Sequence, residues 1–265
     1  MKKPLLVVAH ARSGSTYLCQ LLAAFTRVRA YLEVFHADPE RMVAFLGEDW
    51  PLVRERLGLD DDPAAARNAV CDQPDRLVGC LAALHPDATV SLKVFPSHLD
   101  ERRLALLVPY CQGLIMLRRN LLHTYISRTI ALTTGIWSGA DTSRCHVRFV
   151  PEHFERHVAW VVRFQTATGA IARSHGLPVE WLGYATLCRA GDAEPVVRRI
   201  LEAVGVVDVG DFRRGSVGVT RQDRRDSALD KVVNADELQE YLAVRGLTCL
   251  LDSADDGAIL YDRLT

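Results

Sequence analysis

The 265-residue sequence lacks any apolar run that approaches the roughly 18 residues needed for a membrane-spanning helix. It also lacks an excess of charge of either sign, because 32 basic and 33 acidic residues leave a formal net charge of −1. Such a balance argues against binding to bulk nucleic acid or to a membrane surface. We therefore expect a protein that binds no nucleic acid and inserts in no membrane, with any anion-binding site confined to a local cluster.

The sequence contains no Cys-x-x-Cys pair, and its seven cysteines are scattered and odd in number. This usage is typical of reduced thiols and predicts a cytoplasmic protein without disulfides. The segment Met1-Lys2-Lys3 precedes an apolar run, but His10 and Arg12 interrupt that run well short of a signal peptide.

Short apolar segments alternate with longer segments that repeat apolar residues at helical spacing. This alternation predicts an α/β fold with a parallel sheet covered by helices on both faces, and the length suits one domain over residues 1–265. We expect loops at Gly135–Val150 and Gly210–Ser227. Strands are predicted at the apolar segment that starts at Leu5 and at Val90–Phe95, Gly113–Leu117 and Val179–Gly183, and helices at Ser15–Val28, Leu121–Thr134, Pro151–His175 and Ala193–Val204.

The first predicted strand leads directly into Ala11-Arg12-Ser13-Gly14-Ser15-Thr16 and then into a helix. A tight turn with glycine at a helix start aims several backbone N–H groups at one point, and the helix dipole adds positive potential there. Against the phosphate-loop pattern G-x-x-x-x-G-K-[ST], Ser15 stands at the lysine position and Arg12 supplies the cation instead. The segment predicts an anion site, and an ordinary N-cap at Ser13 or Ser15 is the alternative.

Two later segments suit a second phosphate. Arg119 follows the third predicted strand, and Ser127 comes eight residues later. On one straight helix these residues would lie about 12 Å apart, so a shared ligand requires a chain turn, for which Asn120 is a suitable capping residue. Farther on, Arg213-Arg214-Gly215 places two guanidinium groups beside a glycine, which is suited to clamping a phosphate.

From Leu5 to Gly218, the order of these motifs resembles that of the sulfotransferases that use 3′-phosphoadenosine 5′-phosphosulfate (PAPS). Arg119 with Ser127 is similar to their 3′-phosphate motif, and Tyr184 is similar to the tyrosine that often approaches the adenine. The segments Tyr31–Phe35, Leu92–Phe95 and Thr134–Trp137 most resemble the bacterial trehalose 2-sulfotransferase-like group. The resemblance implies a P-loop-type sulfotransferase fold, PAPS as donor without a metal, and donor-binding roles for Arg12, Ser13, Gly14, Ser15, Thr16, Arg119, Ser127, Tyr184, Arg213, Arg214 and Gly215.

The catalytic pattern departs from that of the cytosolic sulfotransferases, which carry lysine where Arg12 stands and a histidine base in a Lys-Thr-His motif. Here Phe95 stands two residues after Lys93, so the base must lie elsewhere. Glu33 stands where the trehalose-type group has a carboxylate base, and its apolar neighbours are expected to raise its pKa. The alternative for Glu33 is a solvated loop carboxylate without a catalytic role. The alternative base is His36. Lys93 is expected either to point into the site or to form a buried structural ion pair.

A catalytic or metal-binding role is less strongly indicated for the other candidate residues. His153 and His157 are four residues apart, but no third ligand is indicated, so a zinc site is not expected. Cys145-His146 reads as an ordinary surface pair. Trp137 is expected either in the core or in the lining of an acceptor pocket.

The sequence therefore predicts sulfuryl transfer from PAPS to a hydroxyl of a small molecule or glycan. The alternatives are a P-loop small-molecule kinase and a catalytically inert nucleotide-binding relative. A kinase is disfavoured because the strand Gly113–Leu117 ends in arginines rather than in an acidic residue that holds Mg²⁺. The sequence names no acceptor and leaves a homodimer open.

Overall fold

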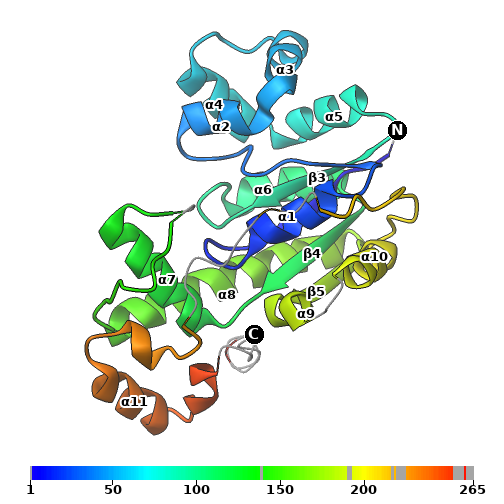
Figure 1. Ribbon diagram of the computed structural model, residues 1–265. Helices are drawn as coiled ribbons and strands as arrows, with labels where there is room; N and C mark the ends of the chain where they lie inside the picture. Colours follow the sequence, from blue (N-terminus) through cyan, green and yellow to red (C-terminus); the bar gives the residue numbers. More distant parts are fainter. Residues whose placement is uncertain are drawn as a thin grey trace.

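The computed structural model describes residues 2–137, 140–189, 193–215, 218, 225–252 and 260. In this part of the chain, five parallel strands form one sheet in the order β2-β3-β1-β4-β5 (Figure 1). Strand β1 lies at the centre, with Leu5 opposite Ser91 of β3 and Gly113 of β4. The predicted α/β fold with a parallel sheet is confirmed. The strands are β1 (Leu5–Val8), β2 (Val28–Ala30), β3 (Thr89–Val94), β4 (Gly113–Arg118) and β5 (Val179–Gly183).

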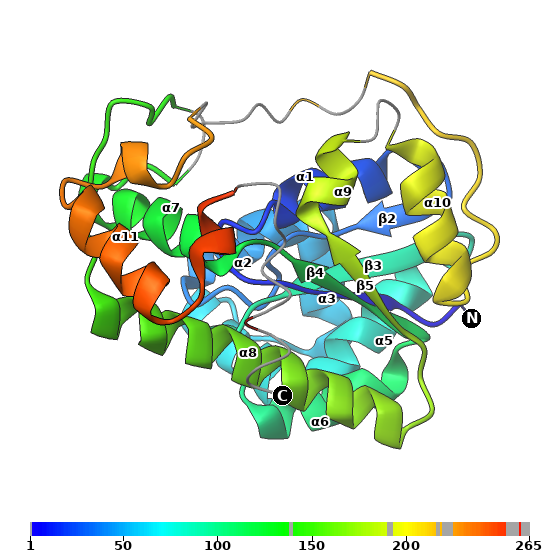
Figure 2. The same ribbon diagram turned by 90° about the horizontal axis from the view of Figure 1, so that it is seen from below.

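Helices cover both faces of the sheet. Helices α1, α9 and α10 pack on one face, while α2 to α6 and the second half of α8 pack on the other. Figure 2 shows α8 running along the lower edge of the molecule. Among the described residues, no helix combines the length and the apolar character that a bilayer crossing requires. The α-helices are α1 (Ser15–Ala23), α2 (Pro39–Leu46), α3 (Trp50–Leu57), α4 (Pro63–Asp72), α5 (Pro74–Leu84), α6 (Glu101–Leu107), α7 (Leu121–Thr134), α8 (Pro151–Ser174), α9 (Tyr184–Arg189), α10 (Glu194–Ala203) and α11 (Ala235–Val244).

Strand β1 is apolar on both faces because both faces are covered. Leu5 and Val7 pack with α1 and α10, whereas Leu6 and Val8 pack toward α5 and α6. A continuous apolar run is expected for a parallel strand buried on both sides. A third apolar cluster joins α7, the first half of α8 and α11, which lie side by side in Figures 1 and 2. This cluster holds α7 at the carboxyl edge of the sheet, where the loops after β1 and β4 meet.

The predicted helix Ser15–Val28 is wrong in its second half. Helix α1 ends at Ala23, and Val28 begins strand β2, which the sequence analysis missed. Phe25 keeps the helical spacing of the apolar residues because it is buried against Phe212, with ring centroids 5.0 Å apart. The helical spacing of apolar residues thus continues past the end of α1 because Phe25 packs in the core, not because the helix extends. The other predicted elements agree within one residue at each end, and the two predicted loops contain no helix or strand among their described residues.

Four helices between β2 and β3 were not predicted. Each begins with a proline in its first turn, a position where the missing N–H costs nothing. The Asp38 side chain caps α2 by accepting from the amides of Glu40 and Arg41, and Asp62 caps α4 in the same way. The Asp-Pro pairs at 38–39 and 62–63 were therefore readable start signals.

Gly113 is required by close packing at the start of β4. A Cβ there would lie 2.8 Å from the Val204 carbonyl oxygen, which belongs to the backbone at the end of α10. We expect Gly113→Ala to lower the free energy of unfolding by about 1–3 kcal/mol, as overpacked cores do. The measurement is urea unfolding of the purified protein.

Gly79→Ala in α5 is the matched control because nothing lies within 4 Å of its added Cβ. Alanine is the better helix former, so this variant should gain up to about 1 kcal/mol. A Gly113→Ala protein as stable as the wild type would contradict the packing described here.

Candidate functional site

The loop between β1 and α1 holds the segment predicted to be an anion cradle. Gly14 is the N-cap of α1 with φ 88° and no side-chain capping bond, and the first turn carries no acidic residue. The alternative of a serine N-cap is therefore wrong. Arg12, with φ 68°, is the non-glycine residue with positive φ among those described. Such backbone strain persists where the surroundings enforce it, often at binding sites.

Two further features of this loop bear on the predicted anion site. The Ser13 hydroxyl is buried without a hydrogen-bond partner, although buried polar groups are normally paired. A Cβ on Gly14 would lie 2.3 Å from ring atoms of Tyr184, so this aromatic ring closes one side of the loop. The loop thus offers an uncapped helix N-terminus, which favours negative charge.

Arg12 connects the cradle with the motif predicted for a second phosphate. Its Nε donates to Ser127 Oγ at 2.9 Å, and Nη1 of Arg119 donates to the Arg12 carbonyl at 2.7 Å. The Arg119 guanidinium also lies 4.4 Å from the Tyr184 ring centroid. The predicted chain turn is present, because Asn120 caps α7 by accepting from two first-turn amides. Burial and the charge of Arg119 lower the pKa of Arg12, and the guanidinium still stays charged.

A second cluster surrounds Glu33, in the loop that follows β2. Lys93 Nζ lies 3.0 Å from Glu33 Oε1, and the lysine side chain is only 1% exposed. On the other oxygen, His98 Nε2 lies 3.4 Å and His36 Nε2 lies 3.9 Å from Glu33 Oε2. Lys93 Nζ also donates to Thr16 Oγ1 at 3.5 Å. Lys93 is therefore an ion-pair partner of Glu33 and at the same time a contact to the cradle.

The expected rise in the pKa of Glu33 is wrong. Burial does raise it, but the hydrogen bond from His98 and the charge of Lys93 outweigh burial and lower the pKa to about 2. The apolar neighbours seen in the sequence mattered less than two polar groups from a distant strand. Glu33 is ionised at neutral pH.

The histidine tautomers follow from backbone contacts. The Phe95 amide donates to His98 Nδ1 at 3.2 Å, and the Asp38 amide donates to His36 Nδ1 at 2.9 Å. In each neutral ring the proton is then on Nε2, which faces Glu33. Neither histidine presents a free lone pair toward the Glu33 carboxylate.

Sequence reasoning missed His98. The residue comes four positions after the end of β3, and a conventional histidine signal was sought two positions after Lys93. A readable signal was the Pro96 in Phe-Pro-Ser-His, which suits the second position of a tight turn at the carboxyl edge of the sheet.

The Arg213-Arg214-Gly215 turn lies beyond the C-terminal end of α1. The Arg213 amide donates to the Ala24 carbonyl at 2.9 Å, and Arg214 Nη2 lies 3.8 Å from Glu194 Oε2 of α10. Ala24 is about 15 Å along the helix axis from the cradle at 1.5 Å per residue. A role for this turn in donor binding stays a prediction, and Ser216 and Val217 lie outside the described residues.

The histidine pair and Trp137 complete the candidates. His157 is buried and lies 3.2 Å from Thr124 Oγ1, whereas His153 on the same helix is exposed. Within the described ranges, no group of three or more histidine, cysteine or carboxylate side chains is arranged to hold a metal ion. Trp137 is 38% exposed, which rules out a core position, and its carbonyl accepts from Arg12.

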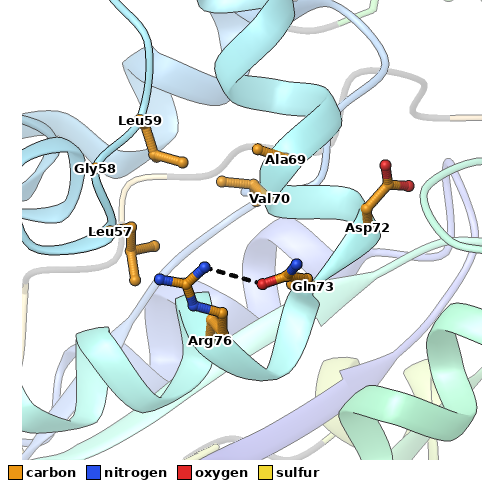
Figure 3. A pocket seen from close by; sticks show the side chains of 8 residues that line it. All are labelled: Leu57, Gly58, Leu59, Ala69, Val70, Asp72, Gln73 and Arg76. Carbon is orange, nitrogen blue, oxygen red and sulfur yellow. Dashed lines mark hydrogen bonds between the residues drawn. The ribbon is translucent and has the colours of Figure 1, made fainter.

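A hollow of about 250 Å³ among α3, α4 and α5 lies apart from these residues (Figure 3). Its polar groups already have partners, since Arg76 donates to Gln73 at 2.9 Å and Asp72 pairs with Arg103 at 2.6 Å. The hollow is lined by Leu57, Gly58, Leu59, Ala69, Val70, Asp72, Gln73 and Arg76, which include no residue of the cradle or of the Glu33 cluster.

Comparison with known proteins gives one family match. The model of a sulfotransferase family matches residues 4–208. No curated protein sequence matches the chain. Among solved structures, a sulfotransferase from Alicyclobacillus acidocaldarius is 16% identical at a TM-score of 0.45, covering 95% of this chain and 96% of its own.

Two further structures are sulfotransferase domains. The one from the curacin biosynthetic pathway is 13% identical at a TM-score of 0.45 and covers 99% of this chain and 90% of its own. The one from the Synechococcus PCC 7002 olefin synthase is 14% identical at a TM-score of 0.42, with 92% and 96% covered. Similarity at this level says nothing of a substrate.

The buried His157 of α8 should make stability depend on pH. Burial, with the charge of Arg128, lowers the pKa of His157 to about 4, against 6.5 in an unfolded chain. Below pH 6.5 the unfolded state therefore binds more protons, so stability falls as the pH drops toward 4. We expect His157→Gln to remove about 3 kcal/mol of that loss between pH 7 and pH 4.

Urea unfolding at several pH values measures this effect. His153→Gln is the matched control on the same helix and should leave the pH dependence of the free energy of unfolding unchanged. A His157→Gln protein with the pH dependence of the wild type would show that His157 is not neutral in the fold.

Proposed function

The chain belongs to the sulfotransferase family, and from this premise we propose that it moves a sulfuryl group from PAPS to a hydroxyl of a small molecule or carbohydrate. One observation carries the proposal: Lys93 Nζ lies within 3.0 Å of Glu33 Oε1 and 3.5 Å of Thr16 Oγ1. This lysine joins the anion cradle to a carboxylate that is able to accept a proton. The site proposed for the donor and the base proposed for the acceptor thus contact the same buried lysine.

The donor suits the cationic and amide groups at the carboxyl edge of the sheet. The uncapped N-terminus of α1 and the unpartnered Ser13 hydroxyl would hold the 5′-phosphosulfate. Arg119 and Ser127, which both contact Arg12, would hold the 3′-phosphate. Bound PAPS supplies the activated sulfuryl group.

In the transfer step, the oxygen of the acceptor hydroxyl bonds to sulfur, and Glu33 accepts the proton of that hydroxyl. The bond between sulfur and the 5′-phosphate oxygen breaks, and 3′-phosphoadenosine 5′-phosphate leaves. Arg12, Lys93 and the cradle amides stabilise the charge that develops on the leaving oxygen, and such preorganised donors are usually the largest catalytic contribution. A carboxylate with a pKa of about 2 is a weak base. Glu33 therefore takes the proton late in the step, after bonding to sulfur has made the acceptor hydroxyl acidic.

Glu33 suits the role of base better than His36. The Nδ1 of His36 accepts from the Asp38 amide at 2.9 Å, which favours the tautomer of the neutral ring with its proton on Nε2. The neutral ring therefore has no free lone pair for a hydroxyl, whereas each oxygen of Glu33 keeps one.

The position of Lys93 also argues against a kinase. In P-loop kinases the hydroxyl that follows the loop lysine holds Mg²⁺ together with an acidic residue at a strand end. Here Thr16 Oγ1 accepts from the lysine ammonium, and β4 ends at Arg118. The hydroxyl that would hold the metal in such a kinase thus faces the Lys93 ammonium.

Arg119→Ala should separate the two phosphate sites. Each charge-assisted hydrogen bond is worth about 1.5–3 kcal/mol, so affinity for 3′-phosphoadenosine 5′-phosphate should fall roughly ten- to a hundredfold. Affinity for adenosine 5′-monophosphate should change little, because that ligand has no 3′-phosphate. Isothermal titration calorimetry with both nucleotides measures this difference.

Arg128→Ala is the control, since this arginine lies over the Trp160 ring of α8. Equal losses for the two ligands, or a wild type without preference for the 3′-phosphorylated one, would refute the assignment of PAPS as donor.

Glu33→Gln should leave nucleotide affinity nearly unchanged and lower turnover by about 10²–10⁴, the usual contribution of a general base. The amide keeps an oxygen for the buried Lys93 and cannot accept the proton. Steady-state kinetics with an accepted hydroxyl compound and a melting curve of the variant are the measurements. Retained activity, combined with an inactive His36→Ala, would move the base to His36.

A further inference from the structure

A tight turn after β3 fixes the His98 side chain. The His98 amide donates to the Phe95 carbonyl at 3.0 Å, and the Phe95 amide donates back to His98 Nδ1 at 3.2 Å. The two rings stack with centroids 4.9 Å apart and an interplanar angle of 28°. Pro96 stands at the second position of this turn, where its fixed φ favours the bend. The imidazole therefore has little freedom to rotate.

This fixed ring directs one donor at Glu33. Because Nδ1 accepts the Phe95 amide, the proton of the neutral ring is on Nε2, which lies 3.4 Å from Glu33 Oε2. The His98 side chain is 2% exposed, so little water competes for the contact. Lys93 holds the other oxygen at 3.0 Å. Both oxygens of the Glu33 carboxylate are thus contacted by groups from the end of β3 and the turn that follows it.

We propose that His98 is a positioning residue for sulfuryl transfer, whose Nε2–H holds the Glu33 carboxylate in the orientation that receives the acceptor proton. The proposal rests on the proposed function. His98 touches neither donor nor acceptor, and its effect passes through Glu33. A misplacement of about 1 Å at a reacting group can cost 10²-fold in rate, which gives such a residue its influence.

His98 and His36 play different parts although both face Glu33 Oε2. His98 is buried and 3.4 Å away, whereas His36 is partly exposed and 3.9 Å away. Among the described residues, the basic groups within 4 Å of the Glu33 carboxylate are Lys93, His98 and His36, and the buried Cys19 thiol also feels the charge of Glu33. Burial lowers the pKa of His98, so its ring is a neutral donor at pH 7 and adds no charge to the cluster.

Two substitutions separate the donated hydrogen bond from the mere presence of a side chain. In His98→Gln the amide nitrogen takes the place of Nε2 and keeps a donor toward Glu33. In His98→Asn the shorter side chain can still accept the Phe95 amide but does not reach Glu33. His153→Asn, on the exposed side of α8, is the control for the substitution itself.

The experiment measures both the transfer kinetics and the Glu33 titration. We expect His98→Asn to lower kcat roughly ten- to a hundredfold with KM within about threefold, and His98→Gln to stay within about threefold of the wild type. The titration is followed by carboxyl ¹³C NMR with labelled glutamate, and Glu33→Gln identifies the resonance. His98→Asn should raise the pKa of Glu33 from about 2 toward its ordinary range, and His98→Gln should restore most of the shift.

The two readouts keep this proposal distinct from the function it rests on. A wild type that binds no 3′-phosphoadenosine 5′-phosphate and transfers no sulfuryl group refutes the function, and the NMR titration still decides whether His98 holds Glu33. The same Glu33 titration in His98→Asn and wild type would overturn the positioning role. So would a folded His98→Gln protein that loses as much activity as His98→Asn.

Discussion

The ion pair between Lys93 and Glu33 is the contact on which the arrangement of the site depends. Lys93 is 1% exposed, and an uncompensated charge at such a position costs about 3–5 kcal/mol. The pair therefore fixes the loop after β2 against the end of β3, and the same ammonium contacts Thr16 in the cradle. Three segments that are far apart in the sequence meet at one cation. A buried lysine is thus both a structural and a functional constraint.

The ion pair also sets the proton chemistry. A carboxylate held by Lys93 and His98 is ionised and oriented, but its basicity is low. In the proposed transfer, catalysis depends mainly on placing charge where the leaving oxygen becomes negative, a task that we assign to Arg12, Lys93 and the amides of the first turn of α1. The positive φ of Arg12 indicates that the fold tolerates strain to keep this loop in place.

The sequence predicted the sheet well because each interior strand is a short apolar run with polar ends, as at Gly113–Leu117. It did not predict β2, since three residues that include Arg29 give no strand signal of their own and owe their conformation to pairing with β3. The cradle was readable from local spacing around Gly14. The environment of Glu33 was not, because its partner His98 is 65 positions away and only the folded sheet edge brings the two together.

The proposed function requires that the cradle and Arg119 together select a nucleotide with both 5′- and 3′-phosphate groups. Thermal unfolding in EDTA with 3′-phosphoadenosine 5′-phosphate, compared with ATP in Mg²⁺, tests it most directly because no acceptor is needed. A ligand at a hundred times its dissociation constant stabilises by about 2.7 kcal/mol, which raises Tm by roughly 5–10 °C for a protein of this size. We predict that shift for 3′-phosphoadenosine 5′-phosphate and a much smaller one for ATP with Mg²⁺. A larger shift with ATP and Mg²⁺ would contradict the account.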